Sequence, residues 1–369
     1  MRLAFCAGVC GLVLVAGPAS ADDKPRPNTL TPKEIADGWL LLFDGETTFG
    51  WKVDGGATVK DGSLILGNGK KTVAYPTTGF GGAFEYKMEV TGPGKVSSPR
   101  GFSDFEAGPA DEWGVVAYSQ HPGRVSGMAS PPGASRTNVG IPDLRPELAT
   151  APFVIDCDGK TALAIRSVKF RPLEAKPLFN GKDLTGWKVF NGDPKRTATK
   201  FEVTKDGELS AKNGPGDLQT VGQWADFVLQ LECKTNGKWL NSGVFFRCIP
   251  DQYQNGYEAQ IQNGYFGDDR TRPLDYGTGA IYRRVPARKV VSNDNEWFTM
   301  TVVANGPHIA TWVNGYQTVD WTDDRKASDN PRQGLKTGKG HLSIQGHDST
   351  TDLLFRNIRL VELPSGEKK

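Results

Sequence analysis

One phrase occurs twice in this chain and constrains its fold more than any other feature. Residues 178–187 read Leu-Phe-Asn-Gly-Lys-Asp-Leu-Thr-Gly-Trp, and residues 42–51 read Leu-Phe-Asp-Gly-Glu-Thr-Thr-Phe-Gly-Trp. In both halves an Asp-Gly turn and a short apolar run follow, at 61–66 and at 206–210. Because the repeat is far longer than one unit of a solenoid, it predicts two tandem globular domains.

Both halves consist of short runs that are typical of β-strands. The runs are roughly 5–8 residues long, rich in Val, Ile, Phe, Tyr, Trp and Thr, and separated by Gly- and Asn-containing turns. Two of these turns, Asn305-Gly306 and Asn314-Gly315, flank one strand and favour hairpins. We therefore predict an all-β chain built of two sandwiches.

The repeats also set the predicted domain limits. Residues 1–21 combine a basic start, an apolar run and a final Ala-Ser-Ala, which predicts a signal peptide and export to the periplasm or the extracellular space. Residues 22–37 form a linker, in which Thr31 caps a short helical turn that starts at Pro32. The first domain covers 38–173 and the second covers 177–364. Between Val90 and Asp111 the first domain is predicted to have a loop, so it is shortened and degenerate.

Composition excludes several partners. The 44 Lys and Arg residues nearly balance the 42 Asp and Glu residues, and the scattered charges give no footprint for nucleic acid. The first apolar run is too short to span a membrane. Cys157, Cys233 and Cys248 are predicted to be buried thiols, with a disulfide between Cys233 and Cys248 as the alternative. Their spacing predicts no zinc site, and we assign no metal and no cofactor.

The polar residues of three predicted strands, together with Trp312 of the predicted Asn-Gly hairpin, are candidates for a binding face. Because alternate side chains of a strand share a face, each strand has one polar and one apolar side. If the apolar sides form one core, the polar sides line a concave sheet with the mixture of groups that binds sugars. The residues concerned are Arg247, Glu258, Gln260, Gln262, Trp312, Gln345 and His347.

Each candidate also has a purely structural interpretation. Glu258 and Arg247 would form a cross-strand ion pair. Gln262 and His347 would be ordinary solvated residues, and Trp312 would belong to the core.

The second domain resembles the 3-keto-disaccharide hydrolase family, whose members have a concanavalin A-like jelly-roll sandwich. The chain departs from the family pattern at Asn263, where an Asp is usual, and at Asp348, where a Gly is usual. The fold that follows is two tandem jelly rolls, the first degenerate. Seven segments carry the resemblance: 178–187, 241–247, 256–261, 278–282, 312–315, 344–347 and 355–359.

The resemblance implies a reaction on an oligosaccharide or glycoside whose C3 hydroxyl has been oxidised to a ketone. The ketone acidifies the C2 proton, so the glycosidic bond breaks by elimination. Glu258 and His347 would be base and acid, in an order that the sequence leaves open. Arg247 and Gln260 would stabilise the enolate, and Gln345, Asn241 and Tyr282 would position the sugar, with Trp312 as a stacking platform. An ordinary glycosidase needs a second inward acid, and no strand position predicts one. The fold is also compatible with a structural calcium ion.

Two other functions fit the same sequence. A non-catalytic carbohydrate-binding module would use Trp312 and the amides and would tolerate the loss of Glu258 and His347. An adhesion protein would present an apolar outer face instead of a polar one.

Overall fold

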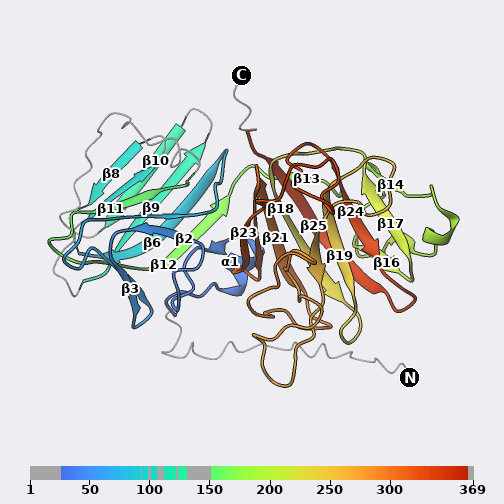
Figure 1. The fold of residues 1–369 in the computed structure, drawn as a ribbon, viewed down its shortest axis with the longest axis horizontal. Coiled ribbons are helices and arrows are strands. Elements are labelled where there is room, and N and C mark those ends of the chain that lie inside the picture. Colours follow the sequence, from blue (N-terminus) through green and yellow to red (C-terminus); the bar gives the residue numbers. More distant parts are fainter. Residues whose placement is uncertain are drawn as a thin grey trace, which may run out of the picture.

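The computed structural model describes residues 26–364 except 93, 99–100, 106–111, 122–123 and 131–150. These residues form antiparallel sheets that pack as two sandwiches side by side (Figure 1), which confirms the all-β prediction. Within this part of the chain, no helix is long and apolar enough to cross a membrane. The predicted signal peptide lies outside the described residues, and the predicted domain limits stay predictions.

The first sandwich pairs a larger sheet with a five-stranded one. The larger sheet has the order β10-β9-β6-β12-β4-β3, with β1 beside β12. Its strands are β1 (Leu40–Leu41), β3 (Ala57–Lys60), β4 (Ser63–Leu66), β6 (Phe84–Thr91), β9 (Gly114–His121), β10 (Arg124–Ser130) and β12 (Leu163–Pro172). The smaller sheet has the order β2-β5-β11-β7-β8, with β2 (Trp51–Asp54), β5 (Thr72–Pro76), β7 (Gly94–Ser98), β8 (Gly101–Phe105) and β11 (Val154–Cys157). The predicted loop between Val90 and Asp111 is wrong, because β7 and β8 pair there as a hairpin.

The second sandwich repeats this arrangement, with one further strand in its larger sheet. Its larger sheet has the order β15-β16-β25-β18-β21-β22-β23, with β13 beside β25. These strands are β13 (Lys176–Pro177), β15 (Lys200–Val203), β16 (Leu209–Lys212), β18 (Phe227–Thr235), β21 (Phe298–Asn305), β22 (His308–Val313), β23 (Tyr316–Thr322) and β25 (Asp352–Glu362). The smaller sheet has the order β14-β17-β24-β19-β20, with β14 (Trp187–Val189), β17 (Gly216–Thr220), β19 (Ser242–Cys248), β20 (Tyr257–Ile261) and β24 (His341–Gly346). A short 3₁₀ turn, η2 (Pro194–Arg196), lies between β14 and β15.

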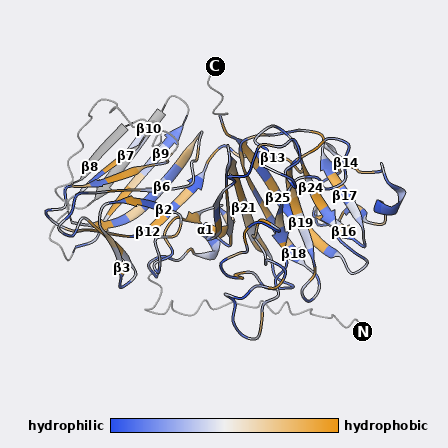
Figure 2. Cartoon of the chain, in the orientation of Figure 1, coloured by the Kyte–Doolittle hydropathy of each residue, from blue (hydrophilic) through white to orange (hydrophobic). Residues whose placement is uncertain are grey.

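Polar and apolar residues alternate along many strands of both sandwiches (Figure 2), because one face of each sheet packs against its partner sheet. In the second sandwich the inward faces meet in one core that includes Phe246, Tyr257, Ile344 and Phe355. Cys157, Cys233 and Cys248 are buried free thiols. The core thus fixes which side chains of β19, β20 and β24 point away from it.

The two sandwiches share an apolar interface on the outer face of the larger second sheet. Val303, Ala310 and Trp312 of that sheet belong to the same buried cluster as Phe80 and Phe170 of the first domain. Polar contacts surround this cluster. Leu41 N donates to Gly315 O at 2.8 Å, Thr77 Oγ1 to Asp320 Oδ1 at 2.8 Å, and Arg288 Nη2 to Asp44 Oδ2 at 2.8 Å.

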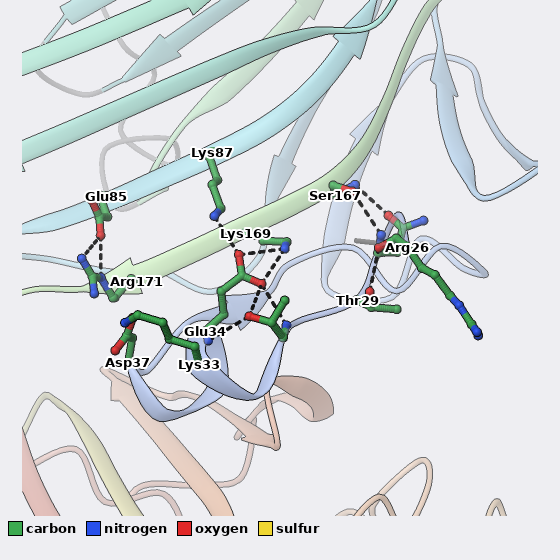
Figure 3. Close-up of polar contacts among 12 residues, drawn as sticks. Arg26, Thr29, Lys33, Glu34, Asp37, Glu85, Lys87, Ser167, Lys169 and Arg171 are labelled. Atoms are coloured by element: carbon green, nitrogen blue, oxygen red, sulfur yellow. Dashed lines mark hydrogen bonds and ion pairs between the residues drawn. The ribbon is translucent and has the colours of Figure 1, made fainter. Parts of the chain in front are cut away.

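The predicted linker is anchored between the sandwiches. Helix α1 (Pro32–Ala36) is capped by Thr31, whose side chain accepts a hydrogen bond from Glu34 N, so the predicted cap is confirmed. The carboxylate of Glu34 also accepts hydrogen bonds from Lys87 and Lys169 of the first domain (Figure 3). Gln230 of the second domain donates to Gly38 O at 3.0 Å just beyond the helix. The segment is therefore held by both domains.

Candidate functional site

The smaller sheet of the second sandwich presents a polar face away from the core. Ala259 and Ile344 point into the core, so their neighbours Glu258 and Gln345 point to the opposite side. The pairing of Phe245 with both Glu258 and Ser343 places β20, β19 and β24 in one continuous surface. The predicted polar face is therefore present.

A cavity of about 380 Å³ lies over this face. It has the size of a typical small-ligand site. The structure brings together five predicted residues there, Asn241, Glu258, Tyr282, Gln345 and His347. The complete lining is Arg196, Asn241, Tyr253, Gln254, Asn255, Glu258, Tyr282, Arg283, Arg332, Gln345 and His347.

Glu258 has the most perturbed acid group of the cavity. Burial raises its pKa from 4.5 to about 8, with a smaller upward contribution from Asp275, and the positive charge of Arg332 opposes the rise. The nearest Arg332 nitrogen is 4.0 Å from the carboxylate. Gly243 on the adjacent strand makes room for this carboxyl group, since a Cβ there would lie 2.6 Å from Glu258 Oε1. At neutral pH the Glu258 carboxyl group therefore carries its proton.

His347 stands at the end of β24, at the rim of the same cavity. Its Nδ1 lies 2.8 Å from Asp348 Oδ2. A carboxylate accepts hydrogen bonds only, so this contact places the proton on Nδ1 and leaves Nε2 as the acceptor nitrogen in the neutral ring. The same contact lowers the pKa of Asp348, after the larger effect of its hydrogen bond from Thr350. Asp348 thus orients the imidazole.

Two amides are anchored next to the cavity by one carboxylate. Asp275 Oδ2 accepts from Asn241 Nδ2 at 2.6 Å and from Gln260 Nε2 at 3.0 Å. Gln260 is almost fully buried, its Oε1 has no partner among the described residues, and it is not part of the cavity lining. The structure therefore separates Asn241, which lines the cavity, from Gln260, which lies beside it.

Residues 174–361, just over half of the chain, match the family model of the 3-keto-alpha-glucoside-1,2-lyase-like domain. The chain belongs to the 3-keto-disaccharide hydrolase family. The family predicted from the sequence is confirmed, and it indicates a carbohydrate-related function. No curated protein matches the chain.

Solved structures similar to this family member include two proposed glycosyl hydrolases from Parabacteroides distasonis. One is 29% identical, with 52% of this chain and 100% of that chain covered and a TM-score of 0.40. The other is 24% identical, with 52% and 94% covered and a TM-score of 0.42. A carbohydrate-binding module from Bacillus subtilis is 15% identical, with 49% and 98% covered and a TM-score of 0.33. Because these TM-scores are below 0.5, the assignment to the family depends on the family model alone.

Arg247 was predicted to stabilise the enolate, and this prediction is wrong. The side chain is fully buried, and its guanidinium group pairs with Asp226 at 2.9 Å. It also donates to the backbone oxygens of Ala225 and Lys336 at 2.7 and 2.9 Å. A β-bulge between Phe245 and Cys248 inserts one extra residue, and Arg247 has a φ of +51° there. The bulge turns the side chain away from the cavity.

The predicted role of Trp312 as a sugar platform is also wrong. Trp312 lies on β22 in the other sheet and is 1% exposed. Its Nε1 donates to Leu41 O at 3.0 Å, and its ring packs 5.8 Å from that of Phe80. It is therefore a core residue of the interface between the two domains.

Sequence reasoning missed the arginines of the cavity and one acid. Arg196, Arg283 and Arg332 come from segments without strand periodicity, although the adjacent pair Arg283-Arg284 directly after Tyr282 was a usable signal. The statement that no strand supplies a second inward acid is wrong as well. Asp217 of β17 lies opposite Gln345 and is fully buried on the same face.

Asp217 accepts hydrogen bonds from two amide groups and is not part of the cavity lining. Burial raises its pKa from 3.8 to about 7, although hydrogen bonds from Gln219 and Gln254 oppose the rise. Gln219 Nε2 donates to Asp217 Oδ2 at 2.8 Å. The residues that the structure describes include no group of three or more His, Cys, Asp or Glu side chains able to hold a metal ion.

Proposed function

We propose that this chain cleaves the glycosidic bond of 3-keto-disaccharides or 3-keto-glycosides, with Glu258 and His347 transferring the protons. The observation that carries the proposal is that a protonated carboxyl group and an oriented imidazole line one sugar-sized cavity. The family relationship supplies the substrate class.

The chemistry needs a base, an acid and a positively charged group that stabilises the enolate. A base removes the C2 proton, which the neighbouring C3 ketone acidifies. Negative charge then develops on the ketone oxygen as the enolate forms, and the C1–O bond breaks. The leaving oxygen takes a proton from an acid, and addition of water to the resulting double bond completes a net hydrolysis.

The protonation states assign the two proton-transfer roles. Glu258 holds its proton at neutral pH because its pKa is raised to about 8, so it is the donor to the leaving oxygen. His347 has its Nδ1 proton engaged by Asp348, so Nε2 of the neutral ring is the base for the C2 proton. We therefore propose this order for the two roles that the sequence left open.

Arginines of the cavity replace Arg247 as the source of positive charge. Arg332 and Arg283 both line the cavity beside Glu258, and guanidinium donors stabilise a developing oxyanion. Asn241, Tyr282 and Gln345 supply hydrogen bonds for the hydroxyls. Gln345 Nε2 donates to Gln254 Oε1 at 3.0 Å, which holds the Gln345 side chain at the cavity.

The test is incubation with 3-keto-lactose, 3-keto-trehalose and their unoxidised parents, with released monosaccharide as the measurement. We expect release from the keto forms only. Because general acid–base groups contribute roughly 10²–10⁴-fold, Glu258→Gln and His347→Ala should each lower kcat by a factor in that range.

Matched controls are Glu202→Gln, an exposed strand residue, and His121→Ala in the first domain. The side chain of His121 is 43% exposed, close to the 41% of His347. Both controls should keep full activity. Binding of the keto sugars without turnover by the unmodified protein would instead indicate a carbohydrate-binding module. Release from the unoxidised parents would indicate an ordinary glycosidase.

A further inference from the structure

A second cavity adjoins the first, and three arginines contribute to its lining. Its volume is about 250 Å³. It shares Glu258, Tyr282, Arg283 and Arg332 with the sugar-sized cavity, and it adds Arg284. The two cavities therefore meet at Glu258, so a ligand that fills both has its reacting bond near that carboxyl group.

The positive charge of this second cavity is not neutralised by the protein. Arg284 donates to the backbone oxygens of Arg283 and Arg332, at 3.2 and 2.6 Å. Arg283 lies over the ring of Tyr282, 5.3 Å from its centroid. Within the described part of the chain, no carboxylate lies within 4 Å of Arg283 or Arg284. Arg332 has only Glu258, at 4.0 Å.

Arg284 is partly buried close to other positively charged groups. Its pKa is lowered, first by burial and then by the positive charges of Arg325 and Arg332. The nearby carboxylate of Asp323 opposes this effect, but it is already paired with Arg325 at 2.7 Å and accepts from Tyr257 Oη at 2.7 Å. Glu258 does not compensate the arginines at neutral pH, because it holds its proton.

The proposed enolate stabilisation accounts for Arg283 and Arg332, which line both cavities, but not for Arg284, which lines only the second. Guanidinium groups bind carboxylates and sulfates through paired hydrogen bonds, and they retain this preference in partly buried sites. We propose that the cavity of Arg283, Arg284 and Arg332 binds an anionic substituent, a carboxylate or a sulfate, of a saccharide whose reacting ring occupies the adjacent cavity. As an assignment of substrate class, this rests on the proposed function.

The experiment measures binding of methyl glucoside, methyl glucuronide and methyl glucoside 6-sulfate to the full chain by calorimetry at low and at moderate salt. One charge-assisted pair is expected to improve affinity about tenfold. We therefore expect at least one anionic sugar to bind about tenfold more tightly than the neutral sugar, and this preference should shrink as salt rises. Preference for the glucuronide alone identifies a carboxylate, and preference for the sulfate ester alone identifies a sulfate.

Arg284→Gln should remove the preference while the affinity for methyl glucoside stays unchanged, because Arg284 lines the second cavity and not the first. Arg272→Gln is the matched control, since Arg272 is exposed and lies over Phe266, outside both cavities. Equal affinity for neutral and anionic sugars would overturn the proposal, and so would an anion preference that survives Arg284→Gln. Cleavage of neutral 3-keto-glycosides without any anion preference would leave the proposed function intact and reject only this inference.

Discussion

Replacing Glu258 with Gln tests the electrostatics of the cavity with a single neutral substitution. In the folded chain the Glu258 carboxyl group has a pKa of about 8, against 4.5 for the ordinary group. Between these values the folded state binds one proton that the unfolded state has lost. This proton stabilises the folded state. Its contribution to the free energy of unfolding is fully present below pH 4.5 and is lost as pH rises toward 8.

The magnitude follows from the two pKa values. Between pH 5 and pH 8 this group alone should lower the free energy of unfolding by about 3.5 kcal/mol. Glu258→Gln cannot titrate, so the variant escapes this loss. Relative to the unmodified protein, it should gain about 3.5 kcal/mol between pH 5 and pH 8. Asp217, with a pKa of about 7, is present in both proteins and cancels in the difference.

The assay is urea unfolding of both proteins at pH 5, 6.5 and 8, followed by tryptophan fluorescence. Glu202→Gln serves as the control, because Glu202 is exposed, and its curve should run parallel to that of the unmodified protein. Parallel curves for Glu258→Gln as well would mean that the carboxyl group is solvated. Its assignment as the proton donor would then be refuted.

Four shorter predictions follow from the same structure. If Glu258 is the donor, kcat should fall as pH rises through about 8, and a rate that rises there would make it the base. Arg247→Met should cost about 3–5 kcal/mol in urea unfolding because it leaves Asp226 buried and unpaired; lost activity with unchanged stability would contradict this. Trp312→Ala should cost about 3–5 kcal/mol in thermal unfolding and leave sugar affinity unchanged; weaker sugar binding at full stability would oppose it. Burial acts to raise the pKa of Glu34, but hydrogen bonds from Lys169 and Lys87 outweigh it and lower this pKa to about 2. Its contribution is present above pH 4.5 and lost as pH falls toward 2, so Glu34→Gln should be less stable than the unmodified protein by about 1–3 kcal/mol at pH 5 and by less at pH 3.

Strand periodicity made part of the site predictable. The two-residue period is a local property of an extended backbone, so Glu258 and Gln345 were assigned correctly to the face opposite Ala259 and Ile344. The capping box at Thr31 was predictable for the same reason, because its hydrogen bonds span only three residues.

The two-residue period gave a wrong prediction where the strand is irregular. Arg247 would share a face with Phe245 in a regular strand, but the bulge before Cys248 sends its guanidinium group to Asp226 instead. A bulge depends on the register between two strands, and one strand's sequence does not reveal it.

The prediction that Trp312 stacks on the sugar was wrong for a different reason. Its strand is regular, yet the face that carries it is covered by the first domain, through Phe80 and Leu41.

The amino-acid sequence by itself determined the two tandem β-sandwiches, the family, and the polar face that carries Glu258, because these depend on local periodicity and on contiguous motifs. Only the tertiary structure decided that Arg332 and Arg283, rather than Arg247, provide the positive charge, and that Asp348 orients His347 above a cavity shared with Glu258. Loops and register place these groups, and both are fixed by contacts between residues that are distant in sequence.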